Sequence, residues 1–144
     1  MIRVLAVGKL KDRRLSELIA DYQRRIRPLA RLEIVELRDQ TPPKEARQLL
    51  DRLGPADGHE LVVALDERGE ARNSEGLAAV LAGHGSVCFL VGGADGLTEE
   101  VRRRADLVLQ LSQLTLTHEW ARALLVEQIY RGLSILRGMP YHRG

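Results

Sequence analysis

Five short apolar runs alternate with five segments in which apolar residues recur at helical spacing. The runs are almost continuously apolar, as in LVVALDE, which is typical of strands that are buried on both faces of a parallel sheet. In the intervening segments apolar residues recur every three or four positions, which predicts helices that pack on that sheet. The expected strands are 2–8, 32–37, 60–67, 86–93 and 107–111, and the expected helices are 14–27, 43–53, 74–83, a short one from 99, and 118–136.

Capping and breaking residues mark the ends of these helices. Pro28 ends the first helix, and Pro43 lies in the first turn of the second. Asn73 or Ser74 can cap the third helix, and Thr98 can cap the fourth. The order βαβαβαβαβα predicts one α/β domain over 1–144, with a mainly parallel sheet covered by helices on both faces.

Three segments follow strands at the carboxyl edge of the expected sheet, where ligands bind in such folds. They are 65–69, 92–97 and 111–118. The glycine-rich segment VGGADGL permits close approach of the backbone to a ligand, although an ordinary tight turn explains it too. It matches neither the Walker A loop nor the G-x-G-x-x-G pattern. The segment LDERG is an ordinary turn in isolation.

The stretch 107–137 dominates the chemistry of the chain, because it joins a strand, a polar loop and the longest helix. Its loop, Leu111 to Leu116, has no proline, glycine or charge and is rich in leucine, so we expect it to be buried. Buried backbone polar groups need partners. A small polar ligand could supply them, or the loop's own serine and threonine hydroxyls could.

The last helix and the tail carry further candidate residues. The helix is apolar on more than one face, which indicates burial beyond one sheet face and favours a subunit interface. Glu127 and Arg131 are spaced to pair, either in a site or on an ordinary surface. The tail holds Tyr141, His142 and Arg143 without an acidic residue, which suits base stacking and phosphate binding, or a frayed basic terminus.

Composition narrows the classes of protein. A chain of 144 residues with a net charge of +2 suits one domain, and this charge alone does not indicate nucleic-acid binding. Only three of the 22 basic residues are lysine, a bias that suits RNA contacts but also follows from GC-rich codons. The single Cys88 excludes an internal disulfide and is expected to be a buried thiol. No metal-ligand spacing, signal peptide or membrane-length apolar run is present, so we expect a cytoplasmic protein without a bound metal.

Several segments together resemble one known family. AVGKLKD, LDERG, FLVGGADGL, LSQLTLTHEWARALLVEQIYRGLSI and PYHR occur in the order and spacing of the ribosomal RNA large subunit methyltransferase H family, of the SPOUT class. The resemblance covers the whole chain. It implies an α/β fold whose C-terminal part forms a trefoil knot, a feature that is otherwise almost absent from proteins. It also implies a homodimer that uses S-adenosylmethionine to methylate N3 of a pseudouridine in 23S ribosomal RNA on the assembled ribosome.

The resemblance also implies roles for individual residues. The implied cofactor-binding residues are Leu65, Gly92, Leu111, Ser112, Gln113, Leu114, Thr115 and Leu116. The implied substrate-binding residues are His118 and Arg122. The implied catalytic residues are Glu127, Arg131, Tyr141, His142 and Arg143, among which Glu127 and His142 are candidates for the base that removes the N3 proton. One departure is visible, because relatives often have proline where this chain has Thr117.

Two other classes of function remain open from the residues alone. A non-catalytic dimeric RNA-binding or ribosome-associated module would fit the arginine bias and the tail, but it would not need the LSQLTL and VGG segments. An NAD- or ATP-dependent enzyme would fit the alternating strands and helices, but both phosphate-loop patterns are missing. Binding of S-adenosylmethionine separates the three classes.

Overall fold

The expected alternation of strands and helices is confirmed by a computed structural model that describes residues 1–144. The strands are β1 (Ile2–Val7), β2 (Leu32–Leu37), β3 (Leu61–Ala71), β4 (Val87–Val91) and β5 (Leu107–Gln110). The helices are α1 (Arg13–Ile26), α2 (Pro42–Leu53), α3 (Ser74–Ala82), α4 (Glu99–Arg104) and α5 (His118–Leu136). Most expected boundaries lie within two residues of these, and the largest difference is the longer β3.

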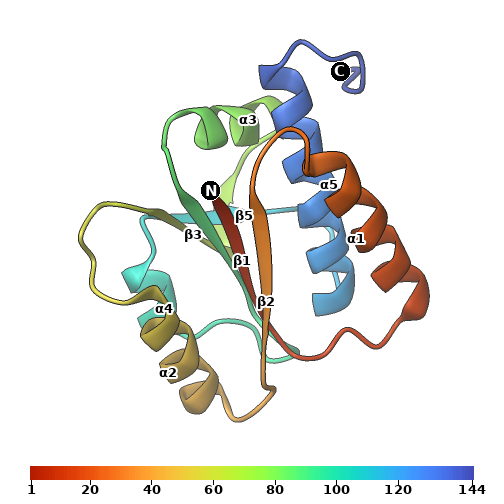
Figure 1. The fold of residues 1–144 in the computed structure, drawn as a ribbon. Helices are drawn as coiled ribbons and strands as arrows, with labels where there is room; N and C mark the ends of the chain where they lie inside the picture. Colours follow the sequence, from red (N-terminus) through yellow and green to blue (C-terminus); the bar gives the residue numbers. More distant parts are fainter.

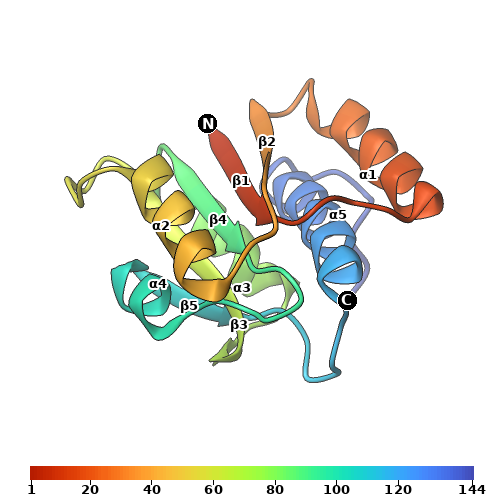
Figure 2. The same cartoon turned by 90° about the horizontal axis from the view of Figure 1, so that it is seen from below.

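All strand pairs are parallel, in one sheet of order β2-β1-β4-β3-β5. Helices α1, α3 and α5 cover one face, and α2 and α4 cover the other (Figures 1 and 2). This arrangement confirms the predicted fold class. Because every strand points the same way, the segments that follow the strands meet at one edge of the sheet. The trefoil knot that the resemblance implies stays a prediction.

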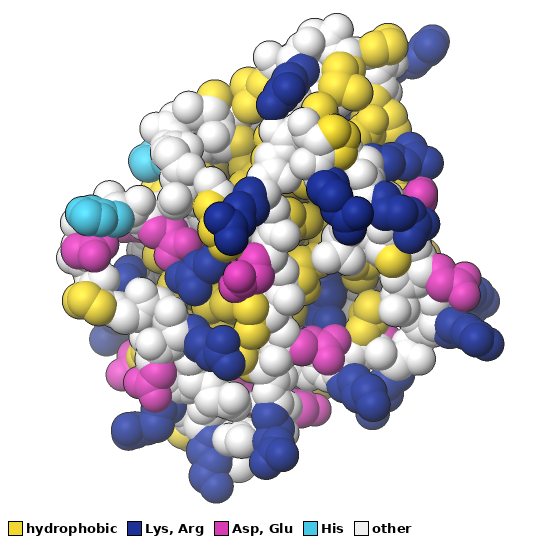
Figure 3. Space-filling view, in the orientation of Figure 1, with side chains coloured by type: hydrophobic (Ala, Val, Ile, Leu, Met, Phe, Trp, Pro, Cys, Tyr) yellow, Lys and Arg dark blue, Asp and Glu magenta, His cyan; other side chains and the backbone are white.

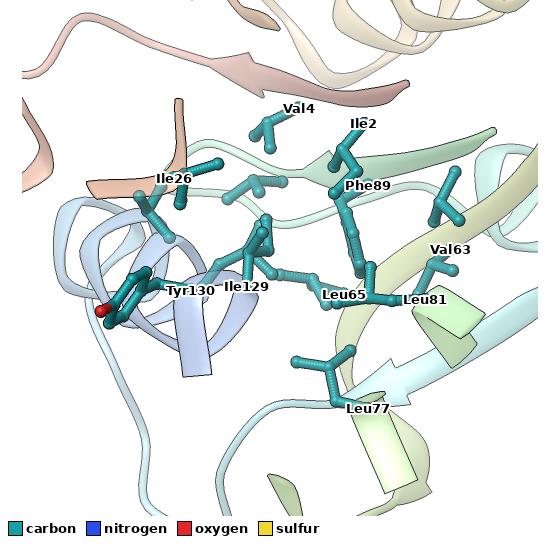
Figure 4. Close-up of a cluster of buried hydrophobic side chains, with 14 of the residues drawn as sticks. Ile2, Val4, Ile26, Val63, Leu65, Leu77, Leu81, Phe89, Ile129 and Tyr130 are labelled. Carbon is teal, nitrogen blue, oxygen red and sulfur yellow. The ribbon is translucent and has the colours of Figure 1, made fainter. Parts of the chain in front are cut away.

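The larger core lies between the sheet and the layer formed by α1, α3 and α5. Phe89 of β4 is fully buried there, and Figure 4 shows it among side chains from neighbouring strands and helices. The smaller core lies on the other face and includes Leu49 of α2 and Val101 of α4. Cys88 belongs to this second core, and burial raises the pKa of its thiol to about 12, so it is the inert thiol that the sequence predicted.

Helix α5 is the middle helix of its layer, which corrects one sequence argument. The apolar side chains on its several faces are covered within the chain, by the sheet beneath it and by α1 and α3 on its two sides (Figure 1). Gly132 permits the close approach of α3, since a Cβ atom there would lie 2.9 Å from Leu81 Cδ1. The apolar residues on several faces of α5 are therefore no evidence for a subunit interface. The large apolar side chains that it leaves exposed are Trp120 and Leu136.

The segment LDERG is not a turn after β3, as its sequence suggested, but part of the strand. Leu65 and Glu70 both pair with Leu109 of β5, so the residues between them bulge out of the register. Gly69 makes the renewed pairing possible, because a Cβ atom at this position would lie 2.7 Å from the Leu109 carbonyl carbon. The bulge turns Asp66 to Arg68 toward the carboxyl edge of the sheet, where they line a pocket.

Candidate active site

A pocket of about 520 Å³ opens at the carboxyl edge of the sheet. Its lining comes from the three segments that the sequence placed at this edge: the bulge of β3, the turn after β4, and the loop between β5 and α5. The position agrees with the general rule for ligand sites in open α/β sheets. The lining mixes apolar walls, such as Leu65 and Leu116, with polar groups, such as Ser112 and Asp95, which suits a small ligand with apolar and polar parts.

The turn after β4 is closed by its own glycines. The Gly96 amide donates to the Gly93 carbonyl at 3.0 Å, and Gly96 has a φ of 74°, which favours glycine. A Cβ atom on Gly92 would lie 2.7 Å from the Gly96 carbonyl carbon. Glycine at 92 is therefore required by the turn itself, and not only by the approach of a ligand, as the sequence suggested.

Arg102 of α4 fixes this turn to the neighbouring wall of the pocket. Its Nη1 donates to the Leu97 carbonyl at 2.6 Å and lies 3.5 Å from Asp66 Oδ2. Asp66 is almost fully buried and accepts from the Arg68 amide at 2.8 Å, which shapes the bulge. Sequence reasoning missed both residues, because an arginine on a short charged helix and an aspartate in a predicted turn carry no distinctive spacing.

The loop between β5 and α5 lines the pocket but is more exposed than its leucines predicted. All the implied cofactor-binding residues line the pocket except Gln113, which is exposed. Leu114 is 78% exposed, and Figure 2 shows the loop projecting from the body of the molecule. Burial of the whole loop within one chain was thus a wrong expectation. Part of the alternative is seen, because the Ser112 hydroxyl accepts from the Leu114 amide at 2.9 Å.

Thr117 takes a defined role at the position where relatives often have proline. It is the N-cap of α5, and its hydroxyl accepts a hydrogen bond from the Trp120 amide at 3.3 Å. The threonine therefore fixes the start of α5 by a side-chain hydrogen bond, where a proline would do so by its restricted backbone.

The two implied substrate-binding residues have different surroundings. His118 lines the pocket. Arg122 does not; it is 3% exposed and donates to Glu36 Oε2 at 2.6 Å and to the Gly8 carbonyl at 2.7 Å. Burial would raise the pKa of Glu36, but the hydrogen bonds from Arg122 and from the Leu10 amide outweigh it and lower that pKa. In this structure Arg122 joins α5 to the ends of β1 and β2 and does not present its charge to a phosphate.

The tail folds back on α5 and gathers most of the implied catalytic residues. Arg131 donates to Glu127 Oε1 at 3.1 Å, and its Nη1 lies 3.1 Å from His142 Nδ1. The Tyr141 hydroxyl lies 2.7 Å from the hydroxyl of Tyr22 in α1 and 3.5 Å from Glu127 Oε2. The tail is thus packed, not frayed, and the Glu127–Arg131 pair is part of a cluster.

Other residues of this cluster were not singled out from the sequence. The Tyr141 ring packs edge-on against Tyr130 at 4.7 Å between ring centroids, and it also lies beneath the Arg131 guanidinium. Tyr22 and Tyr130 share the apolar spacing of ordinary core residues, so spacing could not reveal their contact with the tail. Arg143 is exposed and makes none of these contacts.

Electrostatics sets the charge states within the tail cluster. Burial raises the pKa of Tyr141, and its hydrogen bond to Tyr22 raises the pKa further. The Tyr141 phenol is therefore neutral at physiological pH. The hydrogen bond to Glu127 raises the pKa of Arg131, which keeps its positive charge.

The tail cluster and the pocket are separate within one chain. The pocket ends at Ala121 of α5, whereas the cluster lies around Arg131. Glu127, the member of the cluster nearest to the pocket on α5, is six helical residues from Ala121, about 9 Å along the axis, and Arg131 is ten residues away, about 15 Å. None of the pocket-lining residues belongs to the tail. The structure therefore brings together the implied cofactor residues except Gln113 and the implied catalytic residues except Arg143, but it does not join the two groups in one protomer.

Comparison with known proteins identifies the class. A family model described as predicted SPOUT methyltransferase matches residues 1–142. The crystal structure of the SpoU methyltransferase AviRb from Streptomyces viridochromogenes superposes with a TM-score of 0.52 at 15% identity, over 96% of this chain and 61% of that one. At this identity the likeness shows the fold alone, and this chain spans less than two thirds of that protein.

Relatives of almost the same length narrow the class to one family. "Ribosomal RNA large subunit methyltransferase H" of a Synechococcus species is 46% identical, over 99% of this chain and 94% of the relative. Proteins of the same name from Parasynechococcus marenigrum and Syntrophotalea carbinolica are 45% and 41% identical, over 98% of this chain and 95% and 97% of the relatives. The chain belongs to the ribosomal RNA large subunit methyltransferase H family of SPOUT methyltransferases.

No helix is both long and apolar enough to span a membrane. No three histidine, cysteine or acidic side chains come together as a potential metal site.

Proposed function

We propose that this protein transfers a methyl group from S-adenosylmethionine to N3 of a pseudouridine in 23S ribosomal RNA, on the assembled ribosome in the cytoplasm. The observation that carries the proposal is the pocket. Its three walls are built by LDERG, VGGADGL and LSQLTLTHE, the segments that carry the resemblance to the family. The names of the curated relatives support ribosomal RNA as the substrate.

The pocket residues fit S-adenosylmethionine. A volume of about 520 Å³ lies in the range of small-molecule sites. Leu65, Leu111 and Leu116 offer an apolar slot for an adenine ring, and the glycine turn brings backbone donors and acceptors within reach. The cofactor supplies an activated methyl group with its own leaving group. The residues of this chain therefore mainly orient the reactants and exclude water.

A homodimer could bring the pocket of one protomer and the tail cluster of the other into one active site. Within one chain the tail cluster lies six to ten helical residues from the pocket, and no tail residue lines that pocket. We propose that the tail of one protomer completes the pocket of its partner. The exposed Trp120 and Leu114 lie at the pocket end of the molecule and are suited to the dimer contact.

The N3 proton of the pseudouridine must leave during the reaction. The raised pKa of Tyr141 keeps its phenol protonated, so Tyr141 serves as a hydrogen-bond donor and stacking group. Glu127 and His142 remain the candidates for the base. Both lie beside Arg131, whose positive charge would stabilise the negative charge that develops on the pseudouridine ring as its N3 proton leaves.

Two measurements on the purified protein test the proposal. Calorimetry with S-adenosylmethionine should show binding at the pocket, and ribosomes should gain one labelled methyl group per 23S RNA. Cofactor binding without transfer to any form of 23S RNA would contradict the substrate. Binding to ribosomes without any cofactor binding would instead support the non-catalytic module.

A further inference from the structure

A short basic segment leaves β1 beside the pocket. Residues 9–14, with the sequence KLKDRR, carry four cationic side chains and one acid. Lys9 and Lys11 are exposed and make no ion pair within 4.0 Å. The side chains of Arg13 and Arg14 are 92% and 90% exposed. Four cationic ends are therefore available to solvent at this one place.

The segment lies next to the start of α5, which forms one wall of the pocket. It begins directly after Gly8, where a Cβ atom would lie 3.7 Å from the ring of His118. His118 itself lines the pocket and begins α5. A long substrate whose reactive base enters the pocket would extend past its rim, and the segment lies beside His118 and Glu119, on one side of that rim.

The backbone of the segment is held by hydrogen bonds, whereas its two lysine ends make no ion pair. Glu119 in the first turn of α5 accepts from the Lys11 amide at 2.7 Å and from the Asp12 amide at 2.8 Å. These hydrogen bonds lower the pKa of Glu119 and keep it ionised. Glu36 accepts from the Leu10 amide at 3.1 Å, and Arg122 holds the Gly8 carbonyl.

These contacts differ from those of an ordinary charged surface. At the other end of α1, Arg24 and Arg25 both pair with Asp21, so their charge is locally compensated. Near the pocket Arg13 lies 3.8 Å from Glu17 and Arg14 pairs with Asp12 at 3.2 Å. The carboxylates of Glu36 and Glu119, in contrast, bind backbone amides of the segment, and Lys9 and Lys11 make no ion pair. Figure 3 shows basic and acidic side chains interspersed over the face seen there, so bulk charge is not concentrated on that face.

We infer that residues 9–14 form a phosphate-binding element that holds the RNA backbone beside the pocket, with Glu119 as its positioning residue. This inference rests on the proposed function and adds a substrate contact outside the pocket and the tail. Phosphate contacts from lysine and arginine fix the register of a nucleic acid without reading its sequence. A fixed backbone that carries two unpaired lysine ends suits that task.

The first experiment reverses charge at two exposed positions. Lys9→Glu combined with Lys11→Glu should raise the KM for ribosomes at least tenfold and leave the affinity for S-adenosylmethionine within twofold. The dependence of log kcat/KM on log salt concentration should become shallower by about 1 to 2, because two phosphate contacts are lost. The matched control is Arg24→Glu, at the far end of α1, which should change each quantity less than twofold.

A second pair of variants tests the positioning role of Glu119. Glu119→Ala removes the acceptor of two amides and should raise the KM for ribosomes several-fold while both lysines remain. Glu119→Gln keeps an oxygen acceptor and should restore most of the loss. Equal losses in both variants would contradict a positioning role for this side chain.

Co-sedimentation measures binding to ribosomes independently of methyl transfer. If the unmodified chain methylates ribosomes and the double lysine variant does so with unchanged KM and sedimentation, the inference is overturned and the proposed function stands. If the unmodified chain sediments with ribosomes without methylating them and the variant does not sediment, the basic segment is supported and the proposed reaction fails. Absence of both activities in the unmodified chain overturns both.

Discussion

Arg122 of α5 donates to Glu36 of β2 at 2.6 Å, and the same guanidinium reaches the carbonyl of Gly8 at the end of β1. One buried side chain thus joins the last helix to the two strands at the far side of the sheet. Arginine serves here because its planar fork reaches two acceptors at once, which a lysine ammonium on a single stem does less well.

Arg122→Lys should lower the free energy of unfolding by about 1 to 3 kcal/mol, since at least one charge-assisted hydrogen bond is lost. Urea unfolding measures the difference. Arg137→Lys is the control, because Arg137 is exposed and holds only the Leu29 carbonyl, and it should stay within about 0.5 kcal/mol. Equal stability of both variants would show that Arg122 does not fasten α5.

Gly92→Ala should weaken cofactor binding by tenfold or more, because its Cβ would displace Gly96 and reshape the turn that lines the pocket. Gly92→Val should have a larger effect. Gly85→Ala is the control, since a Cβ there meets nothing within 4 Å. Calorimetry gives the affinity, and circular dichroism verifies that each variant is folded. Unchanged affinity of the Gly92 variants would show that the cofactor binds at another place.

Mixed dimers test the composite site. A chain that lacks residues 141–144 should bind the cofactor within a few fold of the full chain and should methylate ribosomes poorly. When it is mixed with a Gly92→Val chain, each heterodimer has one site with both lesions and one with neither. About one active site per heterodimer should return. An inactive mixture, under conditions where subunits demonstrably exchange, would place the tail in its own chain's site.

The oligomeric state can be tested at one side chain. Trp120 is 54% exposed one turn into α5, near the pocket. Trp120→Glu should convert a dimer to a monomer in light scattering at micromolar concentration, because a charge would be buried at the contact. Leu136→Glu changes an equally apolar position at the other end of the helix and should leave the dimer intact. The opposite pattern would assign the interface to that end.

A buried acid predicts a pH dependence. Glu45 is 4% exposed and accepts from the Gln40 amide at 2.8 Å. Burial raises its pKa above 4.5, and the neighbouring Asp39 and Asp95 raise it further. Glu45→Gln keeps an acceptor but cannot ionise. Because the folded-state pKa of Glu45 is raised, the unmodified protein loses stability relative to the variant as pH rises from 4.5 through that pKa.

Urea unfolding between pH 4.5 and pH 8 measures this difference for the two proteins. It should grow with pH and become constant once Glu45 is ionised in the folded state. Contributions of all other titrating groups cancel, since both proteins share them. A difference that stays constant or shrinks with rising pH would show that the pKa of Glu45 is not raised in the folded protein.

The strands and helices were predictable because each leaves a local pattern. Continuous apolar runs such as 87–91 and caps such as Thr98 act over a few residues, and the structure has both as expected. The bulge of β3 left no such pattern, because it depends on the contact of Gly69 with β5, about forty positions along the chain. The position of α5 between two helices was equally unpredictable, because a helix that is apolar on several faces can be covered by neighbouring helices or by a second subunit.

The candidate site shows the same division. Resemblance to a family selected the loop residues, and the structure gathers them around one pocket with the exception of Gln113. The resemblance also implied Arg122 as a substrate-binding residue, but a sequence does not tell whether a guanidinium faces RNA or a buried carboxylate. Tyr22 was hidden for the opposite reason, because its spacing was that of a core residue and its hydroxyl partner lies in the tail.

The central place of α5 also has a consequence for synthesis on the ribosome. Helix α5 emerges after α1 to α4 and fills the middle of its layer, so the larger core stays open until residue 136 has left the exit tunnel. Until then, the apolar faces of α1 and α3 that later pack on α5 remain in water. Nascent chains stalled before α5 should therefore bind chaperones and be digested rapidly by proteases. Emergence of α5, and not the folding of an early segment, would be the event that commits this domain to its native state.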